Sequence, residues 1–276
     1  MLPISEMKHL NSGECADIYE LDEHTVLKLG KAGWSKEMLY QEFLNGKLIS
    51  GSGIPAPKVY EFVETQDRYG YTMDKLKDLT LLDLMWKYPW KFIKYAKKMA
   101  AMHAQIHSVK APEQLPTLFD KYREFICSKN NIHESAKEQL LQELEKLSAE
   151  GKKCICHGDF HPINILVDGK RFFVIDWVLA AQGNPEADVA GTYLITRTYS
   201  SKIIGQNFFK NFVSAVGGKL IAEIYLKKYI SITGMKRQSI LRWIPLRAAT
   251  YIDVGLPAHL ERIFQEILEK HSTIKG

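Results

Sequence analysis

The chain has 276 residues, of which 46% are hydrophobic and 25% are charged, the proportions of an ordinary globular protein. This length is enough for one large domain or two lobes with a buried core. The first ten residues lack the basic and apolar regions of a signal peptide, and no apolar run approaches the roughly 18 residues that a membrane-spanning helix needs. We therefore expect a cytoplasmic protein with no membrane partner.

The net charge of +5 comes from the last third of the chain, because residues 186–276 contain thirteen Lys or Arg and seven Asp or Glu. These charges are dispersed and do not form the dense basic blocks of a nucleic-acid-binding arm, so we expect no nucleic-acid partner. Of the four cysteines, only Cys154 and Cys156 are close in sequence. We interpret them as small buried thiols that face opposite sides of a strand, because no second pair completes a zinc site.

The first 85 residues predict mostly strands. Residues 18–29 (IYELDEHTVLKL) are typical of two strands joined by a short turn. Apolar residues then recur at helical spacing over residues 35–50, where Ser35 is the expected N-cap. Residues 58–65 and 69–76 predict a second pair of strands.

After Leu79 the apolar period becomes helical. One long helix is predicted to begin after Pro89, another covers residues 135–150, and helices fill most of residues 186–270. Strands followed by helices, with one hairpin among the helices, indicate an α+β fold. We expect a strand-rich N-terminal lobe over residues 1–76 and a mainly helical C-terminal lobe over residues 77–276.

Polar groups concentrate in residues 154–177, CICHGDFHPINILVDGKRFFVIDW, which predict a β-hairpin. The runs ILV and FFVI flank Asp168–Gly169, a strong signal for a two-residue turn. With those two residues as the loop, residue 167 faces residue 170 and residue 164 faces residue 173. Asp176 then lies at the open end of the hairpin, opposite the segment that holds Asp159. We therefore expect Asp159, Asn164 and Asp176 to converge.

Such a cluster of carboxylate and amide oxygens suits magnesium, which takes few protein ligands and leaves its other positions to water and phosphate. A carboxylate beside it can orient a hydroxyl and accept its proton. These are the parts of a phosphoryl-transfer site. Two alternatives stay open: turn and capping roles for Asp159 and Asn164, and a transition-metal site formed by His157, Asp159 and His161.

The motif H-G-D-F-H-P-I-N at His157–Asn164, followed by I-D-W at Ile175–Trp177, resembles the catalytic and metal-binding segments of the aminoglycoside phosphotransferase family. That family includes choline-kinase-like and other small-molecule kinases with the bilobal protein-kinase-like fold. The resemblance extends to Gly183–Ala190 and, more loosely, to almost the whole chain.

This resemblance implies a role for each polar residue of the hairpin region. Asp159 is expected to be the catalytic base, and Asn164 and Asp176 are expected to be the magnesium ligands. His157 and His161 are expected to brace the loop. Asp188 corresponds to an aspartate that opens a helix in the family, and its expected role is an N-cap.

The resemblance also implies a nucleotide-binding N-terminal lobe. A lysine–glutamate pair should grip the nucleotide phosphates there. Lys28, in the predicted strand V-L-K-L, is the candidate lysine. Glu42 is the expected partner, and Glu37 of the same helix is the alternative.

Two further nucleotide contacts are implied. Ser12 and Gly13 are expected to offer backbone N–H groups to phosphate, although their loop has one glycine where many kinases have three. Backbone groups from Asp74 to Leu76 fall where the hinge between the lobes should bind the purine. A hinge binds a nucleobase mainly through backbone groups, so the side chains of the sequence do not distinguish adenine from guanine. The donor is therefore expected to be ATP or GTP.

The resemblance therefore implies a magnesium-dependent kinase that moves the γ-phosphate of ATP or GTP to a hydroxyl of a small molecule. The region expected to build the acceptor pocket is net basic, which favours a neutral or anionic acceptor over a polycation. Either a place in this pocket or a structural role is open to Arg197, Arg242, Trp243 and Arg247. Alternatives are a degenerate kinase that acts as a nucleotide-binding regulator, an antibiotic resistance kinase, and a protein kinase. The last is disfavoured because no extended activation segment follows Trp177.

Overall fold

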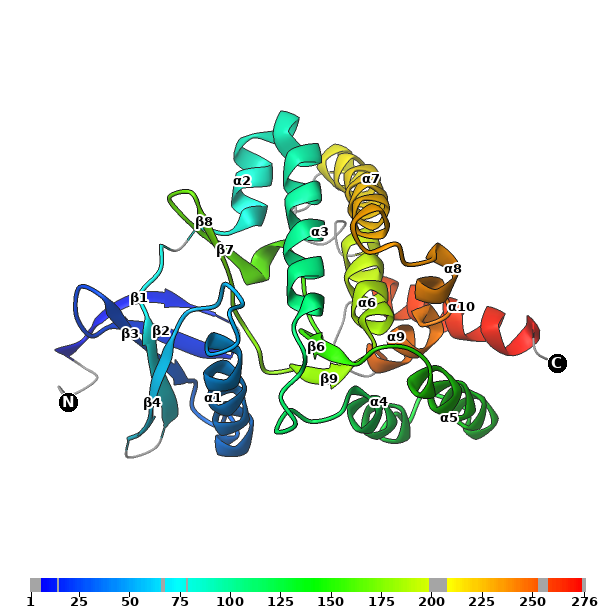
Figure 1. The fold of residues 1–276 in the computed structure, drawn as a ribbon, viewed down its shortest axis with the longest axis horizontal. Coiled ribbons are helices and arrows are strands. Elements are labelled where there is room, and N and C mark those ends of the chain that lie inside the picture. Colours follow the sequence, from blue (N-terminus) through cyan, green and yellow to red (C-terminus); the bar gives the residue numbers. More distant parts are fainter. Residues whose placement is uncertain are drawn as a thin grey trace. The chain divides into compact units, whose positions relative to one another are not determined.

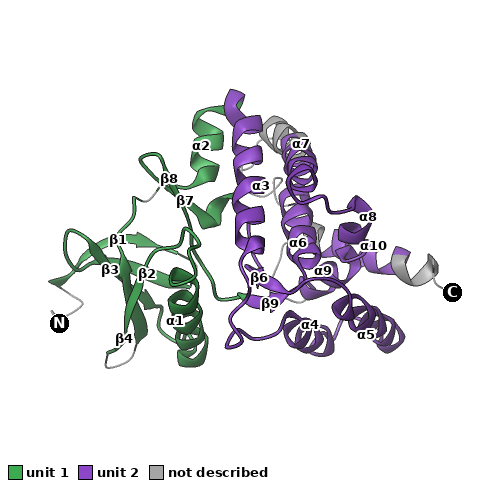
Figure 2. Ribbon diagram, viewed as in Figure 1, with its two compact units in different colours: residues 1–89, 162–180 green, residues 90–161, 181–276 purple. Residues whose placement is uncertain are grey.

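The computed structural model divides into two compact units (Figures 1 and 2). Unit 1 comprises residues 1–89 and 162–180, and unit 2 comprises residues 90–161 and 181–276. The structure describes residues 6–13, 15–65, 68–77, 79–198, 208–252 and 258–274, with the backbone alone at 208–216, 258–260 and 271–274. A functional boundary between residues 76 and 77 stays a prediction.

Unit 1 contains a five-stranded antiparallel sheet in the order β1-β2-β3-β5-β4. The strands predicted from residues 18–29 and 58–76 are present. Strand β1 was not predicted, because all five of its residues are exposed and no apolar alternation marks it. The strands are β1 (Lys8–Ser12), β2 (Ala16–Glu20), β3 (Thr25–Gly30), β4 (Val59–Glu64) and β5 (Tyr69–Asp74).

Helix α1 (Lys36–Ser50) packs against β4 and β5 of this sheet. It begins where predicted, since the Ser35 side chain accepts a hydrogen bond from the N–H of Met38 at 3.4 Å. Its buried face differs from the apolar pattern in the sequence. Glu42 and Asn45 are buried, whereas Met38 is 46% exposed.

Unit 1 also contains the predicted hairpin, formed by β7 (Ile165–Asp168) and β8 (Arg171–Val174). The predicted register is wrong by two residues, because Val167 faces Phe172 and the loop is Gly169–Lys170. The first loop residue, Gly169, has φ +62°, as a type II′ turn requires, whereas the prediction had assumed glycine at the second position. In the observed register, residue 164 lies opposite residue 175.

Short elements complete unit 1 and lead into unit 2. Helix α2 (Leu81–Lys87) begins with a capping box, in which Thr80 and Asp83 satisfy each other's backbone N–H groups. The hairpin is joined to the rest of unit 1 by backbone hydrogen bonds from Val167 to Leu79 at 2.8 Å and from Val174 to Pro55 at 2.7 Å. Two 3₁₀ turns flank these elements, η2 (Pro89–Lys91) and η3 (Pro162–Asn164).

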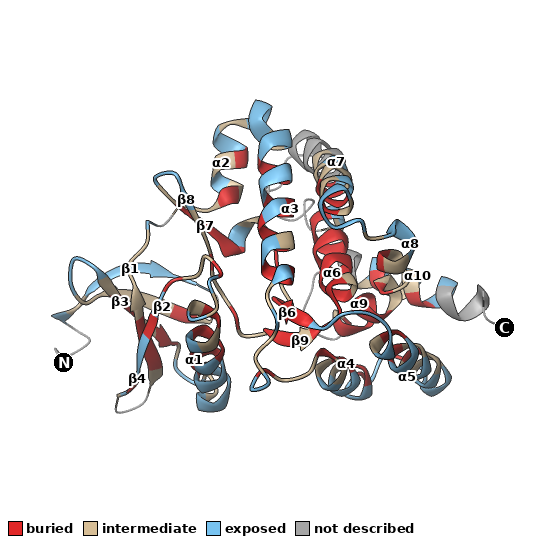
Figure 3. Cartoon of the chain, viewed as in Figure 1, coloured by how far each residue is buried: buried red, intermediate tan, exposed pale blue. Residues whose placement is uncertain are grey.

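Unit 2 is mainly helical, as predicted, with one two-stranded antiparallel ladder, β6 (Cys154–Cys156) with β9 (Ala181–Gly183). Helix α6 packs against α7 and α9, and α3 packs against α7 and β6. Most of α6 is buried (Figure 3). The helices are α3 (Phe92–Ser108), α4 (Leu118–Cys127), α5 (Glu134–Ala149), α6 (Pro185–Thr198), α7 (Phe208–Thr233), α8 (Arg237–Leu241), α9 (Ile244–Thr250) and α10 (Ala258–Ile274).

The chain thus has a strand-rich N-terminal sheet and a helical C-terminal part, which confirms the predicted α+β class. Among the described residues, no helix combines the length and the apolar character that crossing a bilayer requires.

Candidate active site

Lys28 and Glu42 form an ion pair inside unit 1. Strand β3 carries Lys28 and helix α1 carries Glu42, and the Lys28 Nζ atom lies 2.5 Å from Glu42 Oε1. The same oxygen accepts a hydrogen bond from the Tyr71 hydroxyl at 3.0 Å. The alternative partner, Glu37, instead accepts a hydrogen bond from the Ser35 hydroxyl at 2.6 Å. The expected pairing of Lys28 with Glu42 is therefore present.

Asp176, in the same unit, acts electrostatically on Lys28. Burial opposes the charge of the ammonium group, yet the acidic groups of Tyr71, Glu42 and Asp176 raise the pKa of Lys28 well above its ordinary value. Asp176 follows the hairpin and has φ +66°, the one positive φ of a residue other than glycine in the described parts of the chain. Backbone strain of this kind is characteristic of functional positions.

Asn164 lies at the same end of the hairpin as Asp176. It is buried, it ends the turn η3, and its carbonyl accepts the N–H of Ile175 at 3.0 Å. The amide of Asn164 and the carboxylate of Asp176 are hard oxygen donors of the kind that magnesium prefers. Asp159 belongs to the other unit, so the convergence of all three side chains stays a prediction.

Asn45 is a residue of this region that the sequence analysis missed. Its fully buried amide donates to the carbonyl of Trp177 at 2.9 Å and its Oδ1 accepts from Gln41 at 2.9 Å. The bond fixes the segment after Asp176 to helix α1, three residues beyond Glu42. An available signal was a polar residue at helical spacing from Glu42.

Within unit 2, Asp188 accepts hydrogen bonds from the backbone of the loop that carries Asp159. The two Asp188 oxygens accept the backbone N–H groups of His157 at 2.5 Å and of Gly158 at 2.9 Å. The N–H of Asp159 donates to His157 Nδ1 at 3.2 Å, and Gly158 has φ +82°. The predicted N-cap role of Asp188 is wrong, because α6 begins at Pro185 and the carboxylate is used by the loop.

The surroundings of Asp159 keep its carboxylate ionised. Burial raises the pKa of this group, but the hydrogen bond with His161 and the charges of His157, His161 and Arg247 outweigh burial and lower it. His161 Nε2 lies 3.2 Å from Asp159 Oδ2. An ionised carboxylate can accept a hydrogen bond from a hydroxyl and orient it for attack.

Two buried histidines of α3 complete the support of Asp188. His103 Nε2 and His107 Nε2 lie 3.0 Å and 3.2 Å from Asp188 Oδ2, and their Nδ1 atoms lie 2.6 Å from the hydroxyls of Tyr225 and Tyr229. Burial and the neighbouring His107 lower the pKa of His103 to about 3. Hydrogen bonding to Asp188 outweighs burial and raises the pKa of His107. This network was not predicted, because it joins residues more than 80 positions apart.

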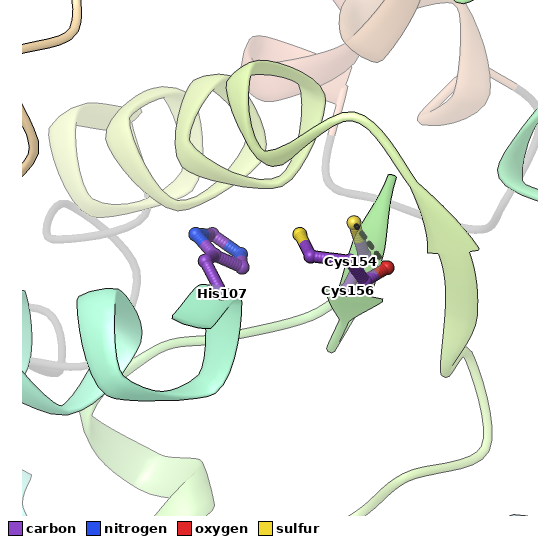
Figure 4. Close-up of side chains that lie close together, drawn as sticks. All are labelled: His107, Cys154 and Cys156. Carbon is purple, nitrogen blue, oxygen red and sulfur yellow. Dashed lines mark hydrogen bonds between the residues drawn. The ribbon is translucent and has the colours of Figure 1, made fainter. Parts of the chain in front are cut away.

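The cysteines of β6 lie beside this network. His107 faces Cys154 and Cys156, and the three ligand atoms lie within 4.8 Å of one another (Figure 4). The expectation of opposite faces is wrong, since residues two apart in a strand share a face. Cys154 Sγ donates to the Gly183 carbonyl and Cys156 Sγ to the Asn184 carbonyl, each at 3.6 Å. Both nitrogens of His107 are also hydrogen-bonded, so each of the three potential metal-ligand side chains has a hydrogen-bond partner within the protein.

The alternative metal site at His157, Asp159 and His161 is not formed. In the part of the chain that the structure describes, the His, Cys, Asp and Glu ligand atoms gather at the cysteine cluster and at His103–His107–Asp188, and not at those three residues.

The remaining expected nucleotide contacts are partly occupied by the protein. The N–H of Ser12 donates to Asn11 Oδ1 at 2.7 Å and that of Gly13 to the Ala16 carbonyl at 2.8 Å. A phosphate contact by either N–H is a prediction that requires these bonds to open. The N–H of Asp74 is likewise bonded to the Lys58 carbonyl at 2.9 Å.

Leu76 is the other expected hinge contact. The N–H of the residue before it, Lys75, donates to the His24 carbonyl at 2.7 Å and so extends the β3–β5 ladder past Asp74. Among the described residues, no such backbone bond is made by the N–H of Leu76. A hydrogen bond from the Leu76 N–H to a nucleobase stays a prediction.

Comparison with solved structures shows proteins of the same fold. A structure of the kinase hAmiN with AMP-PNP, Ca²⁺ and amicoumacin has a TM-score of 0.62 at 14% identity, covering 97% of this chain and 88% of that one. The aminoglycoside phosphotransferase APH(4)-Ia with ADP and hygromycin B has a TM-score of 0.62 at 16% identity, covering 96% and 92%. Choline kinase from Cryptosporidium parvum has a TM-score of 0.56 at 16% identity, covering 99% and 91%.

No curated protein sequence matches the chain. The family model described as "Phosphotransferase enzyme family" matches residues 6–219, which is more than half of the chain and includes both the Lys28–Glu42 pair and the Asp159 loop. The chain belongs to this phosphotransferase family and has its kinase-like fold.

Proposed function

We propose that this protein is a magnesium-dependent kinase that transfers the γ-phosphoryl group of ATP to a hydroxyl of a small molecule. The observation that carries the proposal is the Lys28–Glu42 ion pair, which lies in the same unit as Asp176, whose charge raises the pKa of Lys28. These are the groups that a phosphoryl-transfer site needs for its metal and its phosphates. Relatives of the same fold solved with AMP-PNP or ADP support ATP as the donor.

Each candidate residue has a role in this proposal. Lys28, oriented by Glu42, binds the phosphates of ATP, and the Leu76 N–H donates a hydrogen bond to its adenine. Asn164 and Asp176 would hold magnesium, which supplies positive charge to the phosphate oxygens. Asp159 accepts a hydrogen bond from the acceptor hydroxyl, orients its oxygen and takes its proton as the phosphate bond forms.

The acceptor is proposed to be a neutral or anionic hydroxyl compound, because the last third of the chain carries the excess of basic residues. The structural relatives include proteins solved with the antibiotics hygromycin B and gentamicin, and a choline kinase. A resistance kinase that acts on such an antibiotic is the alternative within the same chemistry.

The test is ATP consumption with a panel of acceptors, run with and without magnesium. Hygromycin B, gentamicin, choline, a neutral sugar and a sugar acid represent the acceptor classes. We expect magnesium-dependent turnover that falls by about 100-fold or more in Asp159→Asn, because a general base contributes that much. Binding of ATP with magnesium should persist in this variant.

The matched control is Asp120→Asn, which changes a carboxylate of α4 in the same unit that accepts a hydrogen bond from Thr117. This variant should keep the turnover of the unmodified protein. Equal turnover of Asp159→Asn and the unmodified protein would remove Asp159 from the mechanism. ATP binding without turnover on any acceptor would instead favour a nucleotide-binding regulator, and transfer to a protein would favour a protein kinase.

A further inference from the structure

Arg247 is a buried arginine whose charge, in the part of the chain that the structure describes, is not balanced by a direct carboxylate contact. It lies on α9, is 4% exposed, and its guanidinium packs against the rings of Tyr122 and Tyr251 at 5.6 Å and 4.8 Å. Buried charges are normally paired, because desolvation is costly. Among the described residues, no carboxylate oxygen lies within 4.0 Å of its nitrogens. Burial of this guanidinium therefore costs desolvation free energy that no described ion pair offsets.

The guanidinium holds the peptide that precedes the candidate base. Arg247 Nη2 donates to the carbonyl of Gly158 at 2.9 Å and also to the hydroxyl of Tyr251. The N–H of the same Gly158 donates to Asp188 at 2.9 Å. Both backbone polar groups of Gly158 are thus hydrogen-bonded, the N–H by Asp188 of α6 and the carbonyl by Arg247 of α9. The residue that follows this doubly held glycine is Asp159.

Helix α6 has a glycine at the point where the arginine passes. A Cβ atom on Gly191 would lie 2.5 Å from Arg247 Nε and 2.8 Å from Nη2, closer than side chains approach one another. The guanidinium reaches the Gly158 carbonyl because position 191 has no side chain. An alanine at position 191 would push it aside.

The permanent charge of Arg247 also acts on Asp159. Among the described groups, those that act electrostatically on this carboxylate include His157, His161, Arg247 and the hydroxyl of Tyr251. Among them, arginine alone stays charged at every accessible pH. Its charge lowers the pKa of Asp159, although the hydrogen bond with His161 contributes more.

We propose that Arg247 is a positioning residue for phosphoryl transfer, which fixes the Gly158 peptide and so aims the Asp159 carboxylate at the acceptor hydroxyl. This inference rests on the proposed role of Asp159 as the base. It differs from a purely structural role, because it predicts a change in turnover and in its pH dependence in protein that remains folded.

The first test compares Arg247→Met and Arg247→Lys, using ATP consumption with the most active acceptor of the panel, or with water if no acceptor is used. Methionine keeps the apolar stem but removes the charge and the donor. In Arg247→Met we expect kcat to fall by about 10- to 100-fold, as for other residues that orient catalytic groups. The KM for ATP should stay within about 2-fold, since this interaction does not bind substrate.

The pH profile separates positioning from stability. Because the base acts when deprotonated, loss of the arginine charge should raise the pKa of Asp159 and shift the acid limb of kcat to higher pH. Lysine keeps the charge but lacks the planar fork. Arg247→Lys should therefore keep the acid limb near its original pH while kcat remains reduced.

Gly191→Ala provides a second test that leaves the arginine in the chain. It should reproduce the fall in kcat of Arg247→Met, and the double variant should fall no further than either single variant, since both changes remove one interaction. Alanine is a better helix former than glycine by about 1 kcal/mol, so an unfolded helix would not explain the loss. Arg262→Met, which removes an exposed ion pair with Glu266 on α10, is the control and should leave kcat unchanged.

Folded Arg247→Met with kcat within about 3-fold of the unmodified protein and an unmoved acid limb would overturn the proposal, since an aimed base loses more than that when misplaced. If Arg247→Met does not fold, the same readouts on Arg247→Lys and Gly191→Ala decide. Failure of the proposed function looks different: Asp159→Asn would then be as active as the unmodified protein, and the inference on Arg247 would fall with it.

Discussion

Lys28 and Glu42 form a close ion pair, with Nζ and Oε1 2.5 Å apart and side chains only 17% and 7% exposed. The Tyr71 hydroxyl donates to the same carboxylate oxygen at 3.0 Å. Burying both charges costs desolvation free energy, and removing one partner leaves the other as an uncompensated buried charge. Its two partners therefore offer a sharp probe of unit 1.

Glu42→Gln should destabilise the protein by about 3 kcal/mol or more, because it leaves the Lys28 ammonium without its carboxylate. Lys28→Met in addition should restore part of that loss, since the uncompensated charge is then removed. The free energy of unfolding from urea titration measures both effects. ATP binding should weaken in each variant.

Glu37→Gln is the matched control on the same helix. Glu37 is exposed and its substitution should change the free energy of unfolding by no more than about 0.5 kcal/mol. Equal effects of Glu37→Gln and Glu42→Gln would show that the Lys28–Glu42 contact contributes little.

Asp176 allows backbone strain and metal binding to be separated. Asparagine tolerates positive φ nearly as well as aspartate, whereas alanine does not. Asp176→Asn should therefore keep the free energy of unfolding, and Asp176→Ala should lower it by about 1–2 kcal/mol. Both variants should lose the dependence of ATP binding on magnesium, measured by calorimetry with and without the metal. Magnesium-dependent binding that survives in Asp176→Ala would contradict the ligand assignment.

His103 should make the protein less stable in mild acid. Its pKa is lowered from 6.5 to about 3, so below pH 6.5 the unfolded chain binds a proton that the folded protein does not. The free energy of unfolding should then fall by about 1.4 kcal/mol per pH unit, or about 2 kcal/mol between pH 6.5 and 5. His107 has the opposite sign: its raised pKa adds stability below pH 6.5, which is lost as the pH rises through the folded-state value.

Urea titrations from pH 5 to 8 test this assignment. His103→Gln loses overall stability, because a buried hydrogen-bonded residue is replaced, but its acid slope should be shallower by about one proton. Parallel slopes for the variant and the unmodified protein would show that His103 takes up its proton in the folded state.

The elements with a strong apolar period were predictable from the sequence, whereas the exact pairing of polar residues was not. The strands from Ala16 to Asp74 and helix α1 have clear periods and turns. The register of the β7–β8 hairpin was missed because Asp168–Gly169 signals a turn without fixing which position glycine takes. Strand β1 was missed because it has no buried side.

At the candidate site, local motifs identified Asp159, Asn164 and Asp176, since they lie within 18 residues of one another. What supports them comes from elsewhere in the chain. Within unit 1, Asn45 binds the segment after Asp176, and within unit 2, Arg247 binds the residue before Asp159. Both contacts arise from long-range packing, and nothing near Asn45 or Arg247 in the sequence marks them. The basic character of residues 186–276 pointed to Arg247 only as one of several cationic side chains.

The division of the chain has a consequence for hybrid proteins. Because unit 1 is built from residues 1–89 together with 162–180, it is not a contiguous fragment that a single junction can exchange. A chimera that exchanges unit 1 with that of a relative must transplant both segments and so needs junctions at 89/90, 161/162 and 180/181. The middle junction falls between Asp159 and Asn164, so such a graft would take the proposed base from one parent and the proposed magnesium ligands from the other.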